Sequence, residues 1–106
     1  MGFQGKMHTE DSVVTIRLTG DVDSRSAHQL NELITAAAEH DPSRLVLLAQ
    51  ELTYLSSAGL RCLVFAHQKM GRHTQIVLVG TRPEVAETIR LTGFDRSILM
   101  QDAVGP

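Results

Sequence analysis

Apolar and polar residues alternate along the chain from residue 12 to residue 18. One face of this segment carries Val14, Ile16 and Leu18, and the other carries Val13, Thr15 and Arg17. A period of two predicts a β-strand with one exposed face. We expect residues 4–9 to pair with it as an antiparallel edge strand, with a turn at Glu10 and Asp11.

The next segment, residues 24–39, changes to a helical period. Its apolar residues recur every three or four positions, at Ala27, Leu30, Ile34, Ala37 and Ala38. This spacing predicts a helix with one apolar face. Ser26 and Gln29 match a capping box, in which the two side chains bond exposed amides at the helix start.

Residues 44–49 form an almost unbroken apolar run of strand length. Such a run is typical of a parallel strand with both faces covered, so we expect a central strand here. A helix is then predicted for residues 57–70, with Gly71 as its terminator. Its apolar stripe comprises Leu60, Leu63, Val64 and His67, whereas Arg61, Gln68 and Arg72 point toward water.

The pattern repeats at residues 75–79, which are predicted to form a strand. Thr81 and Glu84 match a second capping box with a proline in the first turn, and this helix should end near Gly93. Residues 98–100 can add a short strand at the edge of the sheet.

The resulting order, β-β-α-β-α-β-α-β, predicts an α/β fold. Right-handed crossovers between parallel strands lead us to expect a mixed, mostly parallel sheet of four to five strands packed against helices. The chain contains no repeat, low-complexity tract or linker. We therefore expect residues 1–106 to form a single domain with its core at about residues 13–102.

Composition narrows the possible functions. Ten basic and twelve acidic residues without a basic run argue against nucleic acid as a partner. The lone Cys62 cannot form an internal disulfide, and the five histidines are scattered, so neither a metal site nor a cofactor is expected. The start lacks the apolar stretch of a signal peptide, and no segment is apolar for long enough to span a bilayer. We expect a cytoplasmic protein that makes no contact with the membrane.

The junction between the central strand and the second helix, residues 52–60, concentrates hydroxyls and small residues. The first amides of a helix have no partner within the helix, so Ser56 or Ser57 can cap them, and the helix dipole favours negative charge there. A phosphate is therefore tolerated locally. Ala58 and Gly59 leave room for another protein to approach. Taken alone, the serine pair is most simply a helix cap.

Within this junction, residues 55–60 read Leu-Ser-Ser-Ala-Gly-Leu and resemble the phosphorylation loop of the STAS family. Ser57 occupies the position of the phospho-acceptor. The similarity extends to residues 18–23, which look like the family's Gly-x-Leu-Asp turn, and to residues 91–95, which look like its terminal Leu-x-Gly-Leu segment. It covers about residues 13–102, which is almost the whole chain.

The resemblance implies an anti-sigma factor antagonist without enzymatic activity. In that family a GHKL-type serine kinase, which is also the anti-sigma factor, phosphorylates the acceptor, and a PP2C-type phosphatase reverses the reaction. The unphosphorylated form sequesters the kinase, and phosphorylation, here of Ser57, releases it. The partner-binding patch is expected to comprise Asp23, Ser56, Ser57, Ala58, Gly59 and Arg61.

Two positions depart from the family pattern. Many members have aspartate where this chain has Ser56, and many have an acidic residue at the end of the central strand, where this chain has none before Glu51. If that carboxylate orients the loop or the nucleotide in relatives, phosphorylation here is expected to be slower or to need a different kinase.

Other functions are less consistent with the residues. A serine nucleophile would need a Gly-x-Ser-x-Gly elbow and a histidine partner, and neither is recognisable. A nucleotide-binding protein would show a glycine-rich phosphate loop, whereas the glycines here are dispersed among turns. The serious alternative is another STAS role, as a subunit of a stressosome-like assembly or as the regulatory partner of a membrane transporter. These roles share one fold, so the fold does not separate them.

Overall fold

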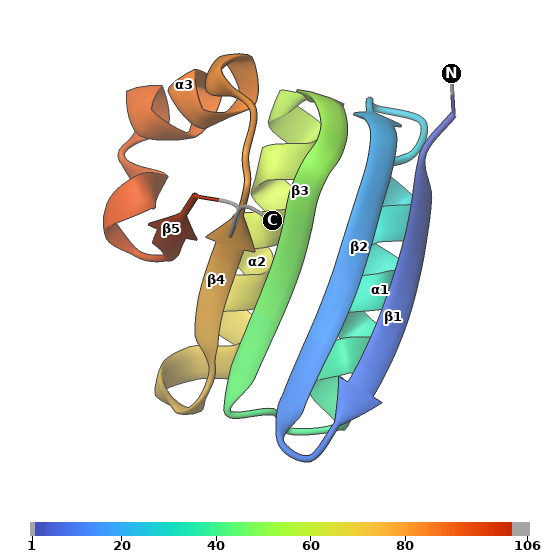
Figure 1. Cartoon of the computed structure of the whole chain (residues 1–106), viewed down its shortest axis with the longest axis vertical. Helices are drawn as coiled ribbons and strands as arrows, with labels where there is room; N and C mark the ends of the chain where they lie inside the picture. The colour runs from blue at the N-terminus through green and yellow to red at the C-terminus, as the bar shows by residue number, and fades with distance from the viewer. Residues whose placement is uncertain (1, 103–106) are drawn as a thin grey trace.

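The computed structural model describes residues 2–102 and contains the predicted order of strands and helices (Figure 1). The elements are β1 (Gln4–Glu10), β2 (Val13–Val22), α1 (Ala27–Glu39), β3 (Arg44–Leu55), α2 (Ser57–Met70), β4 (Gln75–Val79), α3 (Pro83–Thr92) and β5 (Leu99–Gln101), with short 3₁₀ turns at Gly71–His73 and Phe94–Arg96. The predicted α/β class and the predicted edge strands are confirmed.

The five strands form one mixed sheet in the spatial order β1-β2-β3-β4-β5. β1 runs antiparallel to β2, and every other neighbouring pair is parallel. Residues Met7, Ile16, Leu47 and Leu78 stand side by side across the first four strands. Because parallel strands end at the same edge, α2 and α3 both begin at the carboxyl end of the sheet.

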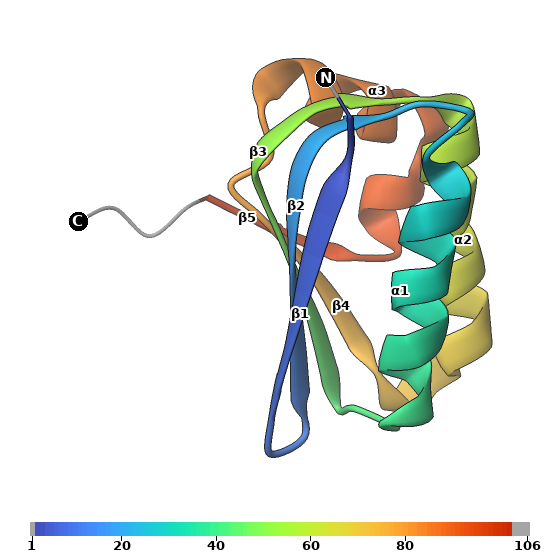
Figure 2. The ribbon, with the colours of Figure 1, turned by 90° about the vertical axis from the view of Figure 1, so that its right-hand side faces the viewer.

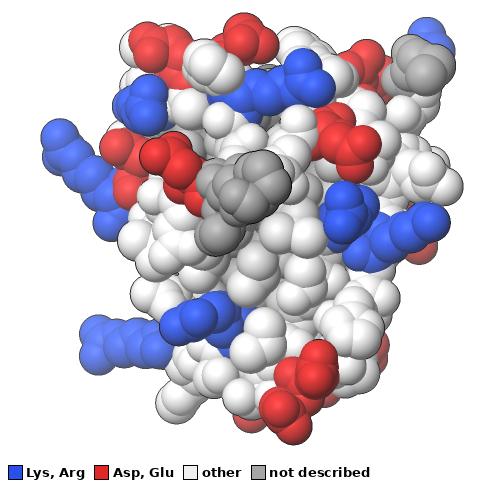
Figure 3. Space-filling view, viewed as in Figure 1, with Lys and Arg blue, Asp and Glu red and all other residues white. Residues whose placement is uncertain are grey.

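Helices α1 and α2 lie side by side on one face of the sheet (Figure 2). The core lies between them and the sheet, where Leu30 and Ile34 of α1 and Leu63 of α2 are almost completely buried. The opposite face carries scattered charges around uncharged surface (Figure 3). The prediction that both faces of β3 are covered is wrong: Leu45, Leu47 and Ala49 are buried, but Val46 and Leu48 are only half-buried.

The start of α1 differs from its prediction. The helix begins at Ala27 instead of Ser24, and the Ser26 side chain makes no capping hydrogen bond. Its hydroxyl oxygen instead accepts from the Asp23 amide at 3.0 Å and lies 3.0 Å from the Asp21 carbonyl. The predicted capping box with Gln29 is wrong because the hydroxyl is already engaged in the turn that precedes the helix.

The second predicted capping box, at α3, is also wrong. Pro83 is the first helical residue, so Arg82 takes the capping position with ψ of 149°. A residue before proline is disfavoured in the helical region, which moves the start one residue beyond the predicted box. The Thr81 hydroxyl is then buried, with no hydrogen-bond partner among residues 2–102. The predicted terminators are confirmed, since Gly71 and Gly93 follow their helices with φ of 65° and 80°.

The two central strands are longer than predicted. β2 continues through Gly20 to Val22, so most of the segment that resembles a turn is strand, and the reversal begins at Asp23. β3 continues to Leu55, and two register irregularities against β2 accompany the extension. Val22 and Leu55 end as register partners. The turn that follows β2, which begins at Asp23, therefore lies beside the start of α2.

Candidate functional site

The start of α2 is anchored by three hydrogen bonds that involve Ser56. The Ser56 amide donates to the Val22 carbonyl at 2.8 Å, which ties the helix start to the end of β2. The Ser56 hydroxyl oxygen accepts from the Gly59 amide at 3.1 Å, and the Ser56 carbonyl accepts from the Leu60 amide at 2.8 Å. Ser56 is therefore the helix cap, and its hydroxyl is occupied by that role.

Gly59 allows this helix start to press against the sheet. It is buried, and a Cβ atom at this position would lie 2.6 Å from Val22 Cγ1 and 2.7 Å from Leu55 Cδ1. The missing side chain thus serves packing inside the fold, whereas the sequence suggested access for a partner. Ala58 is half-buried and remains at the surface beside Ser57.

Ser57 contrasts with its neighbour Ser56. It is exposed as the first residue of α2, and its hydroxyl takes part in no hydrogen bond among residues 2–102. It lines a hollow of about 370 Å³ together with Leu60, Arg61, Val64, Thr92, Gly93, Phe94 and Ser97. No acidic side chain lines this hollow. The structure brings the two motifs at residues 55–60 and 91–95 together around the Ser57 hydroxyl.

The backbone of Asp23 lies near the start of α2, but its carboxylate is hydrogen-bonded within the turn that precedes α1. Oδ1 accepts from the amides of Ser26 and Arg25, both at 2.9 Å, and lies 3.1 Å from the Ser26 hydroxyl. The hydrogen bonds from Ser26, followed by that from the Arg25 amide, hold the pKa of Asp23 below its ordinary value. Asp23 lines a separate hollow with Asp21, Arg25 and Gln29. It shapes the turn beside the site.

Arg61 is exposed on α2 and lines the same hollow as Ser57. It makes no ion pair within residues 2–102.

The two residues that depart from the family pattern, Ser56 and Glu51, each have a defined contact in the structure. Ser56 caps α2, and the Glu51 carboxylate lies 3.5 Å from Arg17 on the exposed sheet, away from the hollow.

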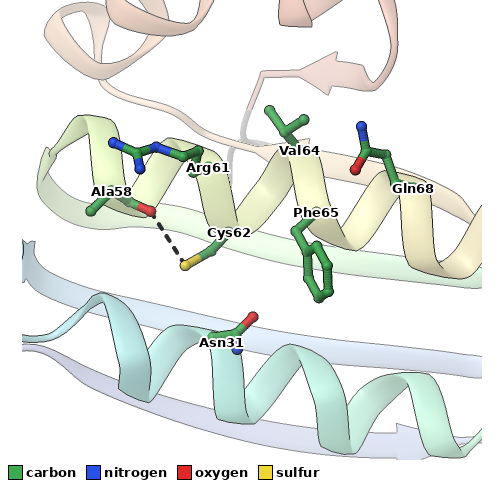
Figure 4. Close-up of a pocket in the computed structure, with 7 residues that line it drawn as sticks. All are labelled: Asn31, Ala58, Arg61, Cys62, Val64, Phe65 and Gln68. Carbon is green, nitrogen blue, oxygen red and sulfur yellow. Dashed lines mark hydrogen bonds between the residues drawn. The ribbon is translucent and has the colours of Figure 1, made fainter.

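Phe65 is a surface residue that the sequence analysis did not select. It is 49% exposed on α2 and lines a second groove, where its ring points toward α1 while the Arg61 and Gln68 side chains of the same groove point to the other side of α2 (Figure 4). Helical spacing predicts that Phe65 is exposed, because it places Phe65 between Arg61 and Gln68 on the polar side of the predicted helix. A large aromatic residue on a polar helix face is a typical feature of binding surfaces.

Cys62 is a buried residue of α2. Its thiol lies 3.3 Å from the Ala27 carbonyl and 3.4 Å from the Ala58 carbonyl. Burial raises the pKa of the Cys62 thiol, which keeps it protonated and weakly nucleophilic. Across residues 2–102 no three acidic, histidine or cysteine side chains are grouped to hold a metal ion, and no helix there is long and apolar enough to cross a membrane.

The match to a family model and the similarity to individual proteins point to the same protein family. The STAS domain family matches residues 5–105. BtrV of Bordetella bronchiseptica, a protein named as an anti-sigma factor antagonist, is 35% identical over 85 residues, which cover 79% of this chain and 73% of BtrV.

Solved structures show the same fold. An anti-sigma factor antagonist from Mycobacterium paratuberculosis superposes with a TM-score of 0.87 at 26% identity, covering 94% of this chain and 86% of that protein. SpoIIAA in its unphosphorylated form superposes with a TM-score of 0.79 at 22% identity, covering 97% and 89% of the two chains. The phosphorylated form of Bacillus SpoIIAA gives a TM-score of 0.72 at 21% identity, with coverages of 97% and 92%. At these identities the SpoIIAA structures bear on the fold alone.

Proposed function

The chain belongs to the STAS domain family, and we propose that it is an anti-sigma factor antagonist that exchanges partners when Ser57 is phosphorylated. One observation carries the proposal: of two adjacent serines, Ser56 is held as the cap of α2, while Ser57 presents an exposed hydroxyl without a hydrogen bond in the described part of the chain, residues 2–102. The names of BtrV and of the Mycobacterium paratuberculosis protein support the antagonist role.

In this role the chain is a substrate and a binding partner. A serine kinase transfers the γ-phosphoryl group of ATP to the Ser57 oxygen, ADP leaves and the hydroxyl proton is released. A PP2C-type phosphatase hydrolyses the phosphoserine and restores the hydroxyl. All catalytic groups belong to those enzymes, and the need for ATP assigns the exchange to the cytoplasm. Ser57 is exposed at a helix start that Ser56 caps, so its hydroxyl is accessible to the active sites of both enzymes.

The phosphate is expected to act on the interface and to leave the fold intact. Phosphorylation adds about −1.5 to −2 charges at neutral pH. The free amides of α2 and the hollow without acidic side chains both tolerate this charge on the isolated protein. A partner packed over Ser57 would have to remove water from it. A penalty of about 3 kcal/mol weakens binding by about a hundredfold, because each 1.4 kcal/mol is tenfold.

The remaining patch residues have different parts in this proposal. Ser56 and Gly59 fix the position of the helix start. Arg61 meets the partner in the Ser57 hollow, and Ala58 meets it in the adjoining groove that Arg61 also lines. Asp23 orders the neighbouring turn through its carboxylate. The proposed contact surface is therefore smaller than the set of residues that resembles the family motif.

A quantitative pull-down from lysate of the native cells tests the proposal. Wild type, Ser57→Ala and Ser57→Asp serve as baits, and Thr9→Asp is the matched control because Thr9 is exposed on β1, outside the hollow, and its hydroxyl makes no hydrogen bond among residues 2–102. We expect a GHKL-type serine kinase on wild type, Ser57→Ala and the control, and its loss from Ser57→Asp. If all four baits instead retain one transporter or assembly protein equally, the proposed switch is wrong and the other STAS role replaces it.

A further inference from the structure

The charge on α2 differs from that on the rest of the molecule. The chain has a net charge of −2, yet none of its twelve acidic residues lies between Leu52 and Pro83. The cations in this stretch are Arg61, Lys69, Arg72 and Arg82. α1, which lies beside α2, carries Glu32 and Glu39 and no lysine or arginine. One of the two helices that cover the sheet is therefore basic and the other acidic.

A groove of about 400 Å³ lies between these two helices. It is lined by Asn31 of α1 and by Ala58, Arg61, Cys62, Val64, Phe65 and Gln68 of α2. Figure 4 shows the Phe65 ring directed from α2 toward α1, on the same side as Asn31 and the Cys62 sulfur. The lining contains a cation and no acidic residue, because Glu32 lines a different hollow on the β1 side of α1.

Phe65 is the apolar centre of this basic groove. Almost half of its side chain is exposed, and the Lys69 ammonium lies 6.0 Å from the centre of its ring. A half-exposed aromatic ring with an ammonium group beside it, and a guanidinium on the same helix, can accept an apolar side chain and the carboxylates that flank it. An acidic partner is favoured by charge complementarity, since Arg61 and Lys69 have no ion-pair partner within residues 2–102.

The groove is continuous with the hollow that contains Ser57. Arg61 and Val64 line both depressions, so they form the ridge between them. A protein that covers Ser57 and extends along α2 reaches Phe65 next. The two depressions can therefore belong to one interface with a charge-sensitive end at Ser57 and an apolar anchor at Phe65.

We propose that the groove centred on Phe65 docks an acidic amphipathic segment of the partner kinase. One large apolar side chain of that segment packs beside the Phe65 ring, and its carboxylates face Arg61 and Lys69. The identity of the partner as a kinase rests on the function proposed above, whereas the acidic, apolar chemistry of the segment rests on the groove itself. In this arrangement the groove supplies most of the affinity and Ser57 supplies the switch.

The first test uses the purified kinase captured by the wild-type bait. Phe65→Ala is expected to weaken binding about tenfold or more, as truncation of an interface anchor does. Met7→Ala is the matched control, because Met7 is 37% exposed on β1 and lines neither the groove nor the Ser57 hollow, and it should leave the affinity unchanged. Lys69→Glu should weaken binding by a similar factor and reduce its dependence on salt. Circular dichroism checks that each variant is folded.

The second test needs no kinase. The ¹⁵N-labelled chain is titrated with an amphipathic peptide of Glu, Leu and one Trp, and with a twin in which Lys replaces every Glu. The acidic peptide should shift the amide resonances of Asn31, Ala58 and Phe65, and Phe65→Ala should abolish these shifts. Equal binding of both peptides, shifts confined to another surface, or displacement of the acidic peptide by a DNA oligonucleotide would overturn the proposal.

The outcomes separate this inference from the function on which it rests. If Ser57→Asp abolishes kinase binding and Phe65→Ala leaves it unchanged, the switch stands and the groove proposal is wrong. If Phe65→Ala weakens kinase binding and Ser57→Asp does not, the groove proposal stands and the switch is wrong. If Phe65→Ala changes only self-association, measured by sedimentation, the occupant is a second copy of this chain and the proposal is also wrong.

Discussion

The starts of α2 and α3 occupy equivalent places in the fold and are built in different ways. Each follows a parallel strand and begins at the carboxyl edge of the sheet. At α2, Ser56 caps the helix and Gly59 lets it press on Val22 and Leu55. At α3, Pro83 begins the helix without a side-chain cap, and the Thr81 hydroxyl is buried without a partner among residues 2–102.

This difference indicates where a surface hydroxyl can serve as a fixed target. A serine that caps its own helix is engaged, and a hydroxyl buried behind the helix start is inaccessible. Among the helix starts within residues 2–102, only that of α2 combines an internal cap with a second, exposed hydroxyl one residue later. The duplication of serine separates the structural role from the proposed regulatory role, and each part of this contrast has a measurable consequence.

The largest expected effect is that of Gly59→Ala on stability. The added Cβ meets Val22 and Leu55 at distances that require the helix start to move. We expect the free energy of unfolding, measured by urea denaturation, to fall by about 1–3 kcal/mol, as for other overpacked sites.

Gly2→Ala is the matched glycine variant, because a Cβ there would meet nothing within 4 Å. It should leave the unfolding free energy within about 0.5 kcal/mol of wild type. An unchanged stability for Gly59→Ala would mean that the α2 start is not held tightly against the sheet, and the contrast with α3 would lose its basis.

The two adjacent serines should differ when each is changed to alanine. Ser56→Ala removes the hydrogen bond from the Gly59 amide and should lower the unfolding free energy by about 1 kcal/mol. Ser57→Ala removes an exposed hydroxyl that has no hydrogen-bond partner within residues 2–102, and should change the unfolding free energy by less than about 0.5 kcal/mol. Equal losses in thermal or urea denaturation would show that both serines cap the helix.

A substitution at the start of α3 should raise the unfolding free energy, whereas the substitutions at the start of α2 lower it. Thr81→Val replaces a buried, unpartnered hydroxyl with a methyl group of similar shape. We expect the unfolding free energy to rise by about 0.5 kcal/mol, because the cost of burying an unpaired polar group is removed. A loss of stability in the same urea experiment would mean that the Thr81 hydroxyl has a stabilising role, as the Ser56 hydroxyl does.

The smallest effect concerns pH and Asp23. Its hydrogen bonds lower the folded-state pKa below the ordinary 3.8, so they contribute stability above pH 3.8 that is lost as the pH falls through the folded value. Asp23→Asn removes this titration. Between neutral pH and about pH 2.5, wild type should lose more unfolding free energy than the variant. Parallel curves of stability against pH for the two proteins would contradict this account of the turn.

Much of the fold follows from local patterns in the sequence. The alternation in residues 12–18 and the helical period in residues 24–39 each reflect burial of one face, so they predicted β2 and α1. Helix starts were predicted less well. Both expected capping boxes failed, because the backbone of the preceding turn, at Ser26, or a proline, at Pro83, decides which residue begins the helix.

The candidate site was predictable only in part. Residues 55–60 identified the region, but the division of roles between Ser56 and Ser57 depends on which hydroxyl faces the Gly59 amide. The role of Gly59 depends on Val22, a residue of a different strand. The helical spacing places Phe65 on the polar side of α2, but the groove that it lines also includes Asn31 of α1, which no pattern within residues 57–70 reports.

The most direct test uses the chain with a true phosphoserine introduced at position 57. Its affinity for the purified kinase is measured by titration calorimetry, and its fold is compared with the unmodified chain by thermal denaturation and by ¹H–¹⁵N spectra. We predict binding weakened by about a hundredfold with an unchanged fold, and shifts confined to the start of α2 and residues 91–97. Undiminished binding, or a phosphorylated chain that unfolds, would contradict the claim that the phosphate acts at the interface.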